Sequence, residues 1–131
     1  MTKILIVDDD TDITLTFKKG LEGDNFEVDT FNDPLEALSN FKASKYDLLL
    51  LDVRMPKMNG FELYKEIEKV DGVVKVCFIT AFEVYYEALR EVFPSLEVEC
   101  FIRKPIEIAS LIKKIKNELS VSQPRSQNLD K

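Results

Sequence analysis

Five short apolar runs alternate with five amphipathic segments along almost the whole chain. The runs have the length of strands, and the segments between them repeat their apolar residues at helical spacing. The strands are expected at Lys3–Val7, Glu27–Phe31, Asp47–Leu51, Val74–Ile79 and Val98–Ile102. The helices are expected at Thr11–Glu22, from Asp33-Pro34 onward, at Phe61–Val70, from about Val84 to Phe93, and from Ile108 to Leu119. This alternation predicts an α/β fold with one parallel, doubly wound sheet covered by helices on both faces.

The length of 131 residues suits one domain, and nearly half of its positions (45%) are hydrophobic. We expect this domain to cover residues 1–119. Residues 120–131 are polar and lack periodicity, so they are expected to form a disordered tail. Cys77 and Cys100 each lie inside an apolar run, which favours two reduced, buried thiols over a disulfide.

Composition excludes several classes of function. The chain has no histidine, so it cannot form a Ser-His-Asp triad, a Cys-His dyad or a histidine-ligated zinc site. The formal net charge of −6 argues against direct binding of nucleic acid. No apolar run reaches the about 18–20 residues of a membrane span, and the N-terminus lacks the pattern of a signal peptide. These features predict a cytoplasmic protein without membrane contact.

Polar residues end four of the predicted strands. These residues are the Asp8-Asp9-Asp10 run, Asp52, Thr80 and Lys104. In a parallel sheet, the carboxyl ends of neighbouring strands meet at one edge, where ligands bind. Clustered carboxylates attract a hard divalent cation such as Mg²⁺, whereas lysine and threonine can hold phosphoryl oxygens. The pattern predicts a phosphoryl-accepting site, with one carboxylate as nucleophile and Asp10 as a helix cap.

The motifs "ILIVDDD", "LLLLDVRMPKMNG", "FITA" and "FIRKP", in this order, resemble those of the receiver domain of two-component response regulators. The resemblance covers roughly Lys3 to Leu119. It implies a flavodoxin-like fold with five helices and a five-stranded parallel sheet of order 2-1-3-4-5. The implied function is a signalling switch that takes a phosphoryl group from a histidine kinase and then changes its output face.

The resemblance also implies the residues that react. Asp52 is the expected phosphoacceptor. Mg²⁺ is the expected cofactor, with Asp8, Asp9, the Asp52 carboxylate and the backbone carbonyl of Arg54 as its ligands. Lys104 is expected to pair with a phosphoryl oxygen.

The switch residues follow from the same family pattern. Thr80 is expected to hydrogen-bond to the phosphoryl group, and Phe101 to turn inward as Thr80 moves. Pro105 matches a proline whose preceding peptide is often cis in this family, and Gly60 is expected to serve a tight turn in the loop after the acceptor. Arg54 and Phe82 occupy two variable positions that tune phosphoryl lifetime in the family, and the bulk of Phe82 is expected to lengthen it.

The expected partners are a sensor histidine kinase or phosphotransfer protein, and an output protein. The output face implied by the family consists of the fourth helix, the fifth strand and the fifth helix. The face offers weak anchors for a partner. The lysines Lys113, Lys114 and Lys116 lie opposite an apolar stripe and are therefore usually solvated, and Tyr86 is a somewhat better candidate. A phosphorylation-dependent dimer is left open, as are the kinase, the target and the length of the parent protein.

Two other functions compete with this interpretation. A phosphatase of the haloacid dehalogenase type also uses a strand-end aspartate and Mg²⁺, but it needs a second aspartate where this chain has Arg54, and a cap domain. An interaction module independent of phosphorylation would not need the full set of Asp8, Asp9, Asp52, Thr80 and Lys104. We therefore expect a regulatory domain that catalyses only its own phosphorylation and dephosphorylation, and no other enzymatic activity.

Overall fold

A five-stranded parallel sheet forms the centre of the structure, a computed structural model that describes residues 1–81 and 100–120. The strands are β1 (Lys3–Val7), β2 (Glu27–Phe31), β3 (Leu48–Asp52), β4 (Lys75–Thr80) and β5 (Phe101–Arg103). The described helices are α1 (Thr11–Glu22), α2 (Pro34–Asn40), α3 (Gly60–Val70) and α5 (Ile108–Ser120). The strand order β2-β1-β3-β4-β5 confirms the predicted α/β fold and its 2-1-3-4-5 topology.

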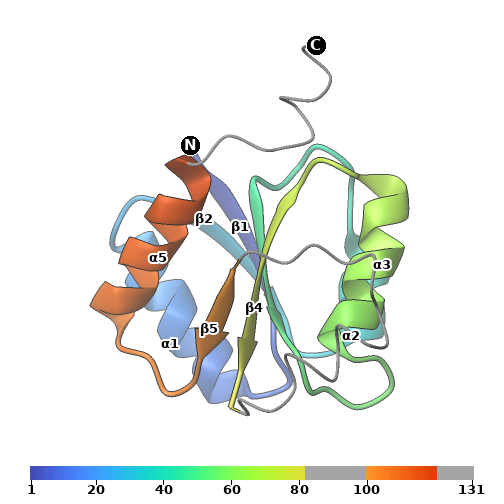
Figure 1. Ribbon diagram of the computed structural model, residues 1–131, viewed down its shortest axis with the longest axis horizontal. Helices are drawn as coiled ribbons and strands as arrows, with labels where there is room; N and C mark the ends of the chain where they lie inside the picture. The colour runs from blue at the N-terminus through green and yellow to red at the C-terminus, as the bar shows by residue number, and fades with distance from the viewer. Residues whose placement is uncertain (82–99, 121–131) are drawn as a thin grey trace.

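Helices cover both faces of the sheet, with α1 and α5 on one side and α2 and α3 on the other (Figure 1). Alternate residues of each central strand pack into two separate cores, because successive side chains of a strand point to opposite faces. In β3, Leu48 and Leu50 join the core beneath α1 and α5, whereas Leu49 and Leu51 join the core beneath α2 and α3. All four leucines are fully buried.

Side-chain caps begin the helices close to where the sequence predicts them. Asp10 caps α1 by accepting a hydrogen bond from the Asp12 amide, and Asp33 caps α2 in the same way from Leu35. Helix α3 begins at Gly60, after a reciprocal capping box between Asn59 and Glu62 that the sequence analysis did not identify.

Some expectations fall outside the described residues. These are the helix from Val84 to Phe93, the first part of the strand from Val98, and the tail beyond residue 120. Within the described ranges, no helix is both long enough and apolar enough to cross a membrane.

The expectation of two reduced cysteines is wrong, because Cys77 and Cys100 form a disulfide. Cys77 lies in β4, and Cys100 immediately precedes β5. The register pairs Phe78 with Phe101, so the two cysteines lie opposite each other one position earlier. Their Cα atoms are 4.6 Å apart, within the range that a disulfide spans. Sequence spacing could not reveal this pairing, since it depends on the register between two strands.

We expect reduction of this bond to lower the free energy of unfolding by about 3 kcal/mol, since it closes a loop between residues 23 positions apart. The loss arises mainly in the unfolded chain, which gains conformational freedom. Urea denaturation of the wild type with and without dithiothreitol measures the difference. The double variant Cys77→Ala/Cys100→Ala is the control and should not respond to the reductant. Equal midpoints for both forms of the wild type would contradict the expectation.

Candidate functional site

The carboxyl ends of four neighbouring strands bring the predicted polar residues together. Asp8 follows β1 directly, Asp52 ends β3, Thr80 ends β4, and Lys104 follows β5. Strand pairing places Asp52 beside Ile79 and Thr80 beside Arg103, so these ends are adjacent in the sheet. The Lys104 amide also donates a backbone hydrogen bond of 2.8 Å to the Thr80 carbonyl, which continues the β4–β5 pairing to the edge of the site.

Three carboxylates form the centre of this edge. Side-chain oxygens of Asp8, Asp9 and Asp52 all lie within 4.8 Å of one another. Asp8 is fully buried and Asp52 is 5% exposed, whereas Asp9 is exposed to solvent. The cluster therefore has two desolvated carboxylates and one that faces the solvent.

Lys104 supplies the positive charge nearest to the buried pair. Its Nζ lies 2.9 Å from Asp8 Oδ2 and 3.4 Å from Asp52 Oδ1. The contact with Asp8 is an ion pair without the alignment of a hydrogen bond, and Asp8 Oδ2 accepts no aligned hydrogen bond from the described residues. One lysine thus only partly neutralises two buried carboxylates.

Backbone and side-chain contacts fix the orientation of Asp8. Its Oδ1 accepts a hydrogen bond of 2.9 Å from the Asp10 amide. Its own amide donates to the Phe31 carbonyl, and its carbonyl accepts from the Asn32 side chain at 2.8 Å. Asn32 also donates to the Thr14 hydroxyl at 3.0 Å, which links the end of β2 to α1. Asn32 could not be identified from the sequence, since a single asparagine after a strand is typical of any turn.

The shared charge shifts the pKa values of the site. Burial has the largest effect on Asp52 and raises the pKa of its carboxyl. The adjacent Asp8 charge raises this pKa further, whereas Lys104 lowers it. Together these effects bring the pKa of Asp52 to about 7. Burial alone would lower the pKa of Lys104, but its contacts with Asp8 and Asp52 outweigh that effect and raise it. An added cation would favour the ionised form of Asp52.

The donor set fits a hard divalent cation. Mg²⁺ prefers oxygen ligands, retains several waters and is commonly held by one or two carboxylates. Asp8 Oδ2 is a buried oxygen without an aligned donor, and Asp9 opens the cluster toward water. Arg54, whose carbonyl the family pattern implies as a ligand, lies in the exposed loop two residues after Asp52.

The loop after Asp52 returns directly to the backbone of Asp52 and Val53. The Gly60 amide donates a 3.0 Å hydrogen bond to the Val53 carbonyl. A Cβ atom at residue 60 would overlap the Asp52 carbonyl oxygen. Gly60 has no positive φ, so glycine is required here for close approach of the backbone, not for the conformation of a turn.

Phe101 begins β5, and Pro105 follows Lys104 beyond the end of that strand. The Phe101 ring is half-buried against Phe78 and Phe61, with centroid distances of 5.8 and 6.1 Å. Its ring thus packs toward the core beneath α2 and α3. The peptide between Lys104 and Pro105 is cis. Phe82 and Tyr86 lie outside the described residues.

We expect the stability of the metal-free protein to fall as the pH rises from about 4 to about 7. The raised pKa means that the folded protein keeps the Asp52 proton that the unfolded chain releases in this range. Asp52→Asn removes this penalty and should raise the free energy of unfolding at pH 8 by roughly 2 kcal/mol, with little gain at pH 4.

Urea denaturation at pH 4 and pH 8 in a chelating buffer measures this effect. Asp12→Asn, which changes an exposed carboxylate in the first turn of α1, is the control. A difference between Asp52→Asn and wild type that is the same at both pH values would contradict the assignment of the raised pKa to Asp52.

Comparisons with known proteins agree with this geometry. Residues 4–116 match the family model of the response regulator receiver domain. The chain is 40% identical over 129 residues to a transcriptional regulatory protein CpxR homolog of Haemophilus influenzae, covering 98% of this chain and 55% of that protein. It thus spans about half the length of the first curated relatives it matches.

Solved structures show the same fold. The non-phosphorylated HemR receiver domain of Leptospira biflexa superposes with a TM-score of 0.82 at 31% identity, covering 95% of this chain and 98% of that one. The response regulator TrrA of Thermotoga maritima, solved in complex with Mg²⁺-BeF, gives a TM-score of 0.77 at 32% identity, covering 89% and 98%. The family match, the strand order and the acidic strand ends together lead to one conclusion: this chain belongs to the response regulator receiver domain family.

Proposed function

We propose that this receiver domain is a signalling switch that accepts a phosphoryl group on Asp52 with the help of Mg²⁺. The observation that carries the proposal is the convergence of Asp8, Asp9, Asp52 and Lys104 at one sheet edge. Asp52 suits the role of nucleophile because it ends a fully buried strand. The Mg²⁺-BeF complex of the related TrrA supports Mg²⁺ as the cofactor.

The proposed step is transfer of phosphorus from a donor to a carboxylate oxygen. An Asp52 oxygen bonds to phosphorus while the bond from phosphorus to the donor breaks. If the donor is a phosphohistidine, the leaving imidazole nitrogen takes up a proton. This chain contains no histidine, so the phosphohistidine belongs to a sensor kinase or phosphotransfer protein.

Each neighbour of Asp52 has a role in this proposal. Mg²⁺, held by Asp8, Asp9, Asp52 and the Arg54 carbonyl, would offset negative charge on the phosphoryl oxygens. Lys104 pairs with one of those oxygens, and the Thr80 hydroxyl donates to another. Because Thr80 ends β4 and Lys104 directly follows β5, their shift toward the phosphoryl group would pass to Phe101. The domain catalyses only its own phosphorylation and the hydrolysis that reverses it.

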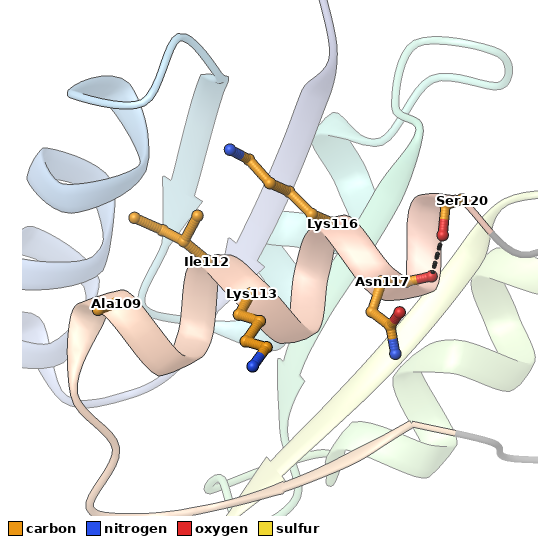
Figure 2. A pocket seen from close by; sticks show the side chains of 6 residues that line it. All are labelled: Ala109, Ile112, Lys113, Lys116, Asn117 and Ser120. Atoms are coloured by element: carbon orange, nitrogen blue, oxygen red, sulfur yellow. Dashed lines mark hydrogen bonds between the residues drawn. The ribbon is translucent and has the colours of Figure 1, made fainter.

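We place the protein in the cytoplasm, with its output through α5, β5 and the fourth helix. Figure 2 shows the exposed side of α5, where six side chains line a depression of about 460 Å³: Ala109, Ile112, Lys113, Lys116, Asn117 and Ser120. Lys116 also pairs with Asp24 at 2.6 Å. Lysines beside an apolar side chain suit a protein partner with acidic and apolar groups, and the net charge of −6 disfavours direct contact with nucleic acid.

Incubation with acetyl phosphate and Mg²⁺ is expected to add one phosphoryl group, which intact mass detects. The gain should disappear without Mg²⁺ and in Asp52→Asn, because both the charge compensation and the nucleophile are then lost. Asp12→Asn, a control outside the cluster, should behave as the wild type does. A folded protein that binds Mg²⁺ but gains no mass would instead favour an interaction module independent of phosphorylation.

Lys104→Met is expected to separate cation binding from phosphorylation. Loss of the lysine charge beside Asp8 and Asp52 should tighten Mg²⁺ binding at pH 8 by roughly tenfold, since the two cations repel each other. The rate of phosphorylation should fall by about a hundredfold, because a donor to the transferring group is lost. Calorimetric titration and intact mass measure the two effects.

The matched control for this variant is Lys57→Met. Lys57 pairs with Asp33 at 3.0 Å, outside the carboxylate cluster, so its loss should change neither quantity. Weaker Mg²⁺ binding in Lys104→Met would contradict the proposed competition between the lysine and the cation.

A further inference from the structure

The Cys77–Cys100 disulfide joins the two strands that carry Thr80 and Lys104. Cys77 lies three residues before Thr80 on β4, and Cys100 lies four residues before Lys104 at the start of β5. Cys100 is also the immediate neighbour of Phe101. The bond thus crosslinks the two neighbouring chain segments whose carboxyl ends lead into the proposed phosphoacceptor site.

The bridged and the reduced pair fit the same sheet. The Cα atoms of the two cysteines are 4.6 Å apart, close to the about 4.7–4.9 Å that separates neighbouring strands in any sheet. The Phe78 amide donates a 2.9 Å hydrogen bond to the Cys100 carbonyl, which holds this register through the backbone as well. Opening the bond therefore does not require the strands to move apart.

Both cysteines belong to the core beneath α1 and α5, and Cys100 is the one nearer to solvent. Cys77 is fully buried, whereas Cys100 is 8% exposed. Strand β5 has three residues and, in the described sheet, pairs only with β4. Cys100 immediately precedes this edge strand, so a small reagent can reach its sulfur after a local opening that leaves the central strands paired.

We propose that Cys77 and Cys100 form a reversible thiol–disulfide site that controls how fast Asp52 is phosphorylated. This inference rests on the proposed function and location, since disulfides in the cytoplasm are usually transient and redox-responsive. Its reaction partners are low-molecular-weight disulfides and thiols of the glutathione class.

Oxidation proceeds in two exchange steps. The Cys100 thiolate attacks a sulfur of the small disulfide, whose S–S bond breaks and releases one thiol that takes up a proton. The Cys77 thiolate then attacks the Cys100 sulfur of the mixed disulfide and releases the second small thiol. The two cysteines lose two electrons and two protons, and the small disulfide gains both; an excess of small thiol drives the reverse reaction.

The bond affects the switch through the position of β5. In the bridged form, Cys100 is fixed to β4, so Phe101 stays against Phe78 and the Lys104 amide stays on the Thr80 carbonyl. In the reduced form, Lys104 is held beside Asp8 and Asp52 by its ion pairs and by the pairing and packing of a three-residue edge strand, without the crosslink to β4. The bridged form should therefore present the lysine more constantly and accept a phosphoryl group faster.

The first test measures the thiol chemistry of the whole wild-type chain without reference to phosphorylation. The protein is equilibrated in buffers with different ratios of reduced and oxidised glutathione, the thiols are blocked with N-ethylmaleimide, and the mass is measured. We expect the reduced protein to carry two blocked thiols and the oxidised protein none, and we expect the buffer to convert each form into the other. Cys77→Ala should form a mixed disulfide with glutathione at Cys100, and Cys100→Ala should leave the buried Cys77 unreacted. A bond that persists in excess dithiothreitol until the protein unfolds would overturn the proposal.

The second test compares the initial rate of phosphorylation by acetyl phosphate and Mg²⁺ in the two forms. The bridged form is expected to react about fivefold faster or more, the lower end of usual coupling between two sites. Cys77→Ala/Cys100→Ala should react at one rate in all redox buffers. Equal rates for the two wild-type forms would overturn the coupling. Absence of phosphorylation in both forms would contradict the proposed function itself, and with it the coupling, whatever the alkylation shows.

Discussion

The desolvation of Asp52 is the constraint on which the site depends. The carboxylate follows four leucines that pack into both cores and exclude water, and it shares its surroundings with the fully buried Asp8. A buried charge of this kind persists only where opposite charge compensates it. Lys104 provides part of that charge, but burial and the adjacent Asp8 charge outweigh it and raise the pKa of Asp52 to about 7. The raised pKa at this edge thus originates largely in the apolar strand that Asp52 ends.

The compensating charge comes from the strand with the fewest contacts to the sheet. Strand β3 pairs with β4 along its full length and with β1 from Leu48 to Leu51, whereas the three residues of β5 pair only with β4 in the described sheet. Asp52 thus ends a central strand, whereas the lysine that pairs with it follows an edge strand. This difference is suited to a switch, because segments that move in regulation come from the less stable parts of a fold.

The sequence predicted the fold well because periodicity and strand-end chemistry are local properties. Alternating strands and helices predicted a parallel sheet whose polar strand ends face one edge, whereas the strand order that brings Asp8, Asp52 and Lys104 together was implied by the resemblance to receiver domains. The disulfide and the role of Asn32 depend on which residues become neighbours across strands, and a short window of sequence does not contain that information. Cysteines in apolar runs suggested buried thiols, but the register of β4 and β5 placed their sulfurs face to face. The glycine at residue 60 was expected for a turn, whereas its reason is contact with the acceptor's own backbone.

The close approach of Gly60 to the Asp52 carbonyl affects which glycines of this chain can be replaced. At Gly23, an added methyl group would meet only two carbonyl oxygens of its own helix at 3.4 Å, so alanine can replace it at little cost. At Gly60, the same methyl group would press on the peptide of Asp52, and relief would require either the start of α3 or the acceptor to shift. Among descendants of this sequence, residue 60 is therefore restricted by the chemistry of a residue eight positions away, although its own side chain takes no part in that chemistry.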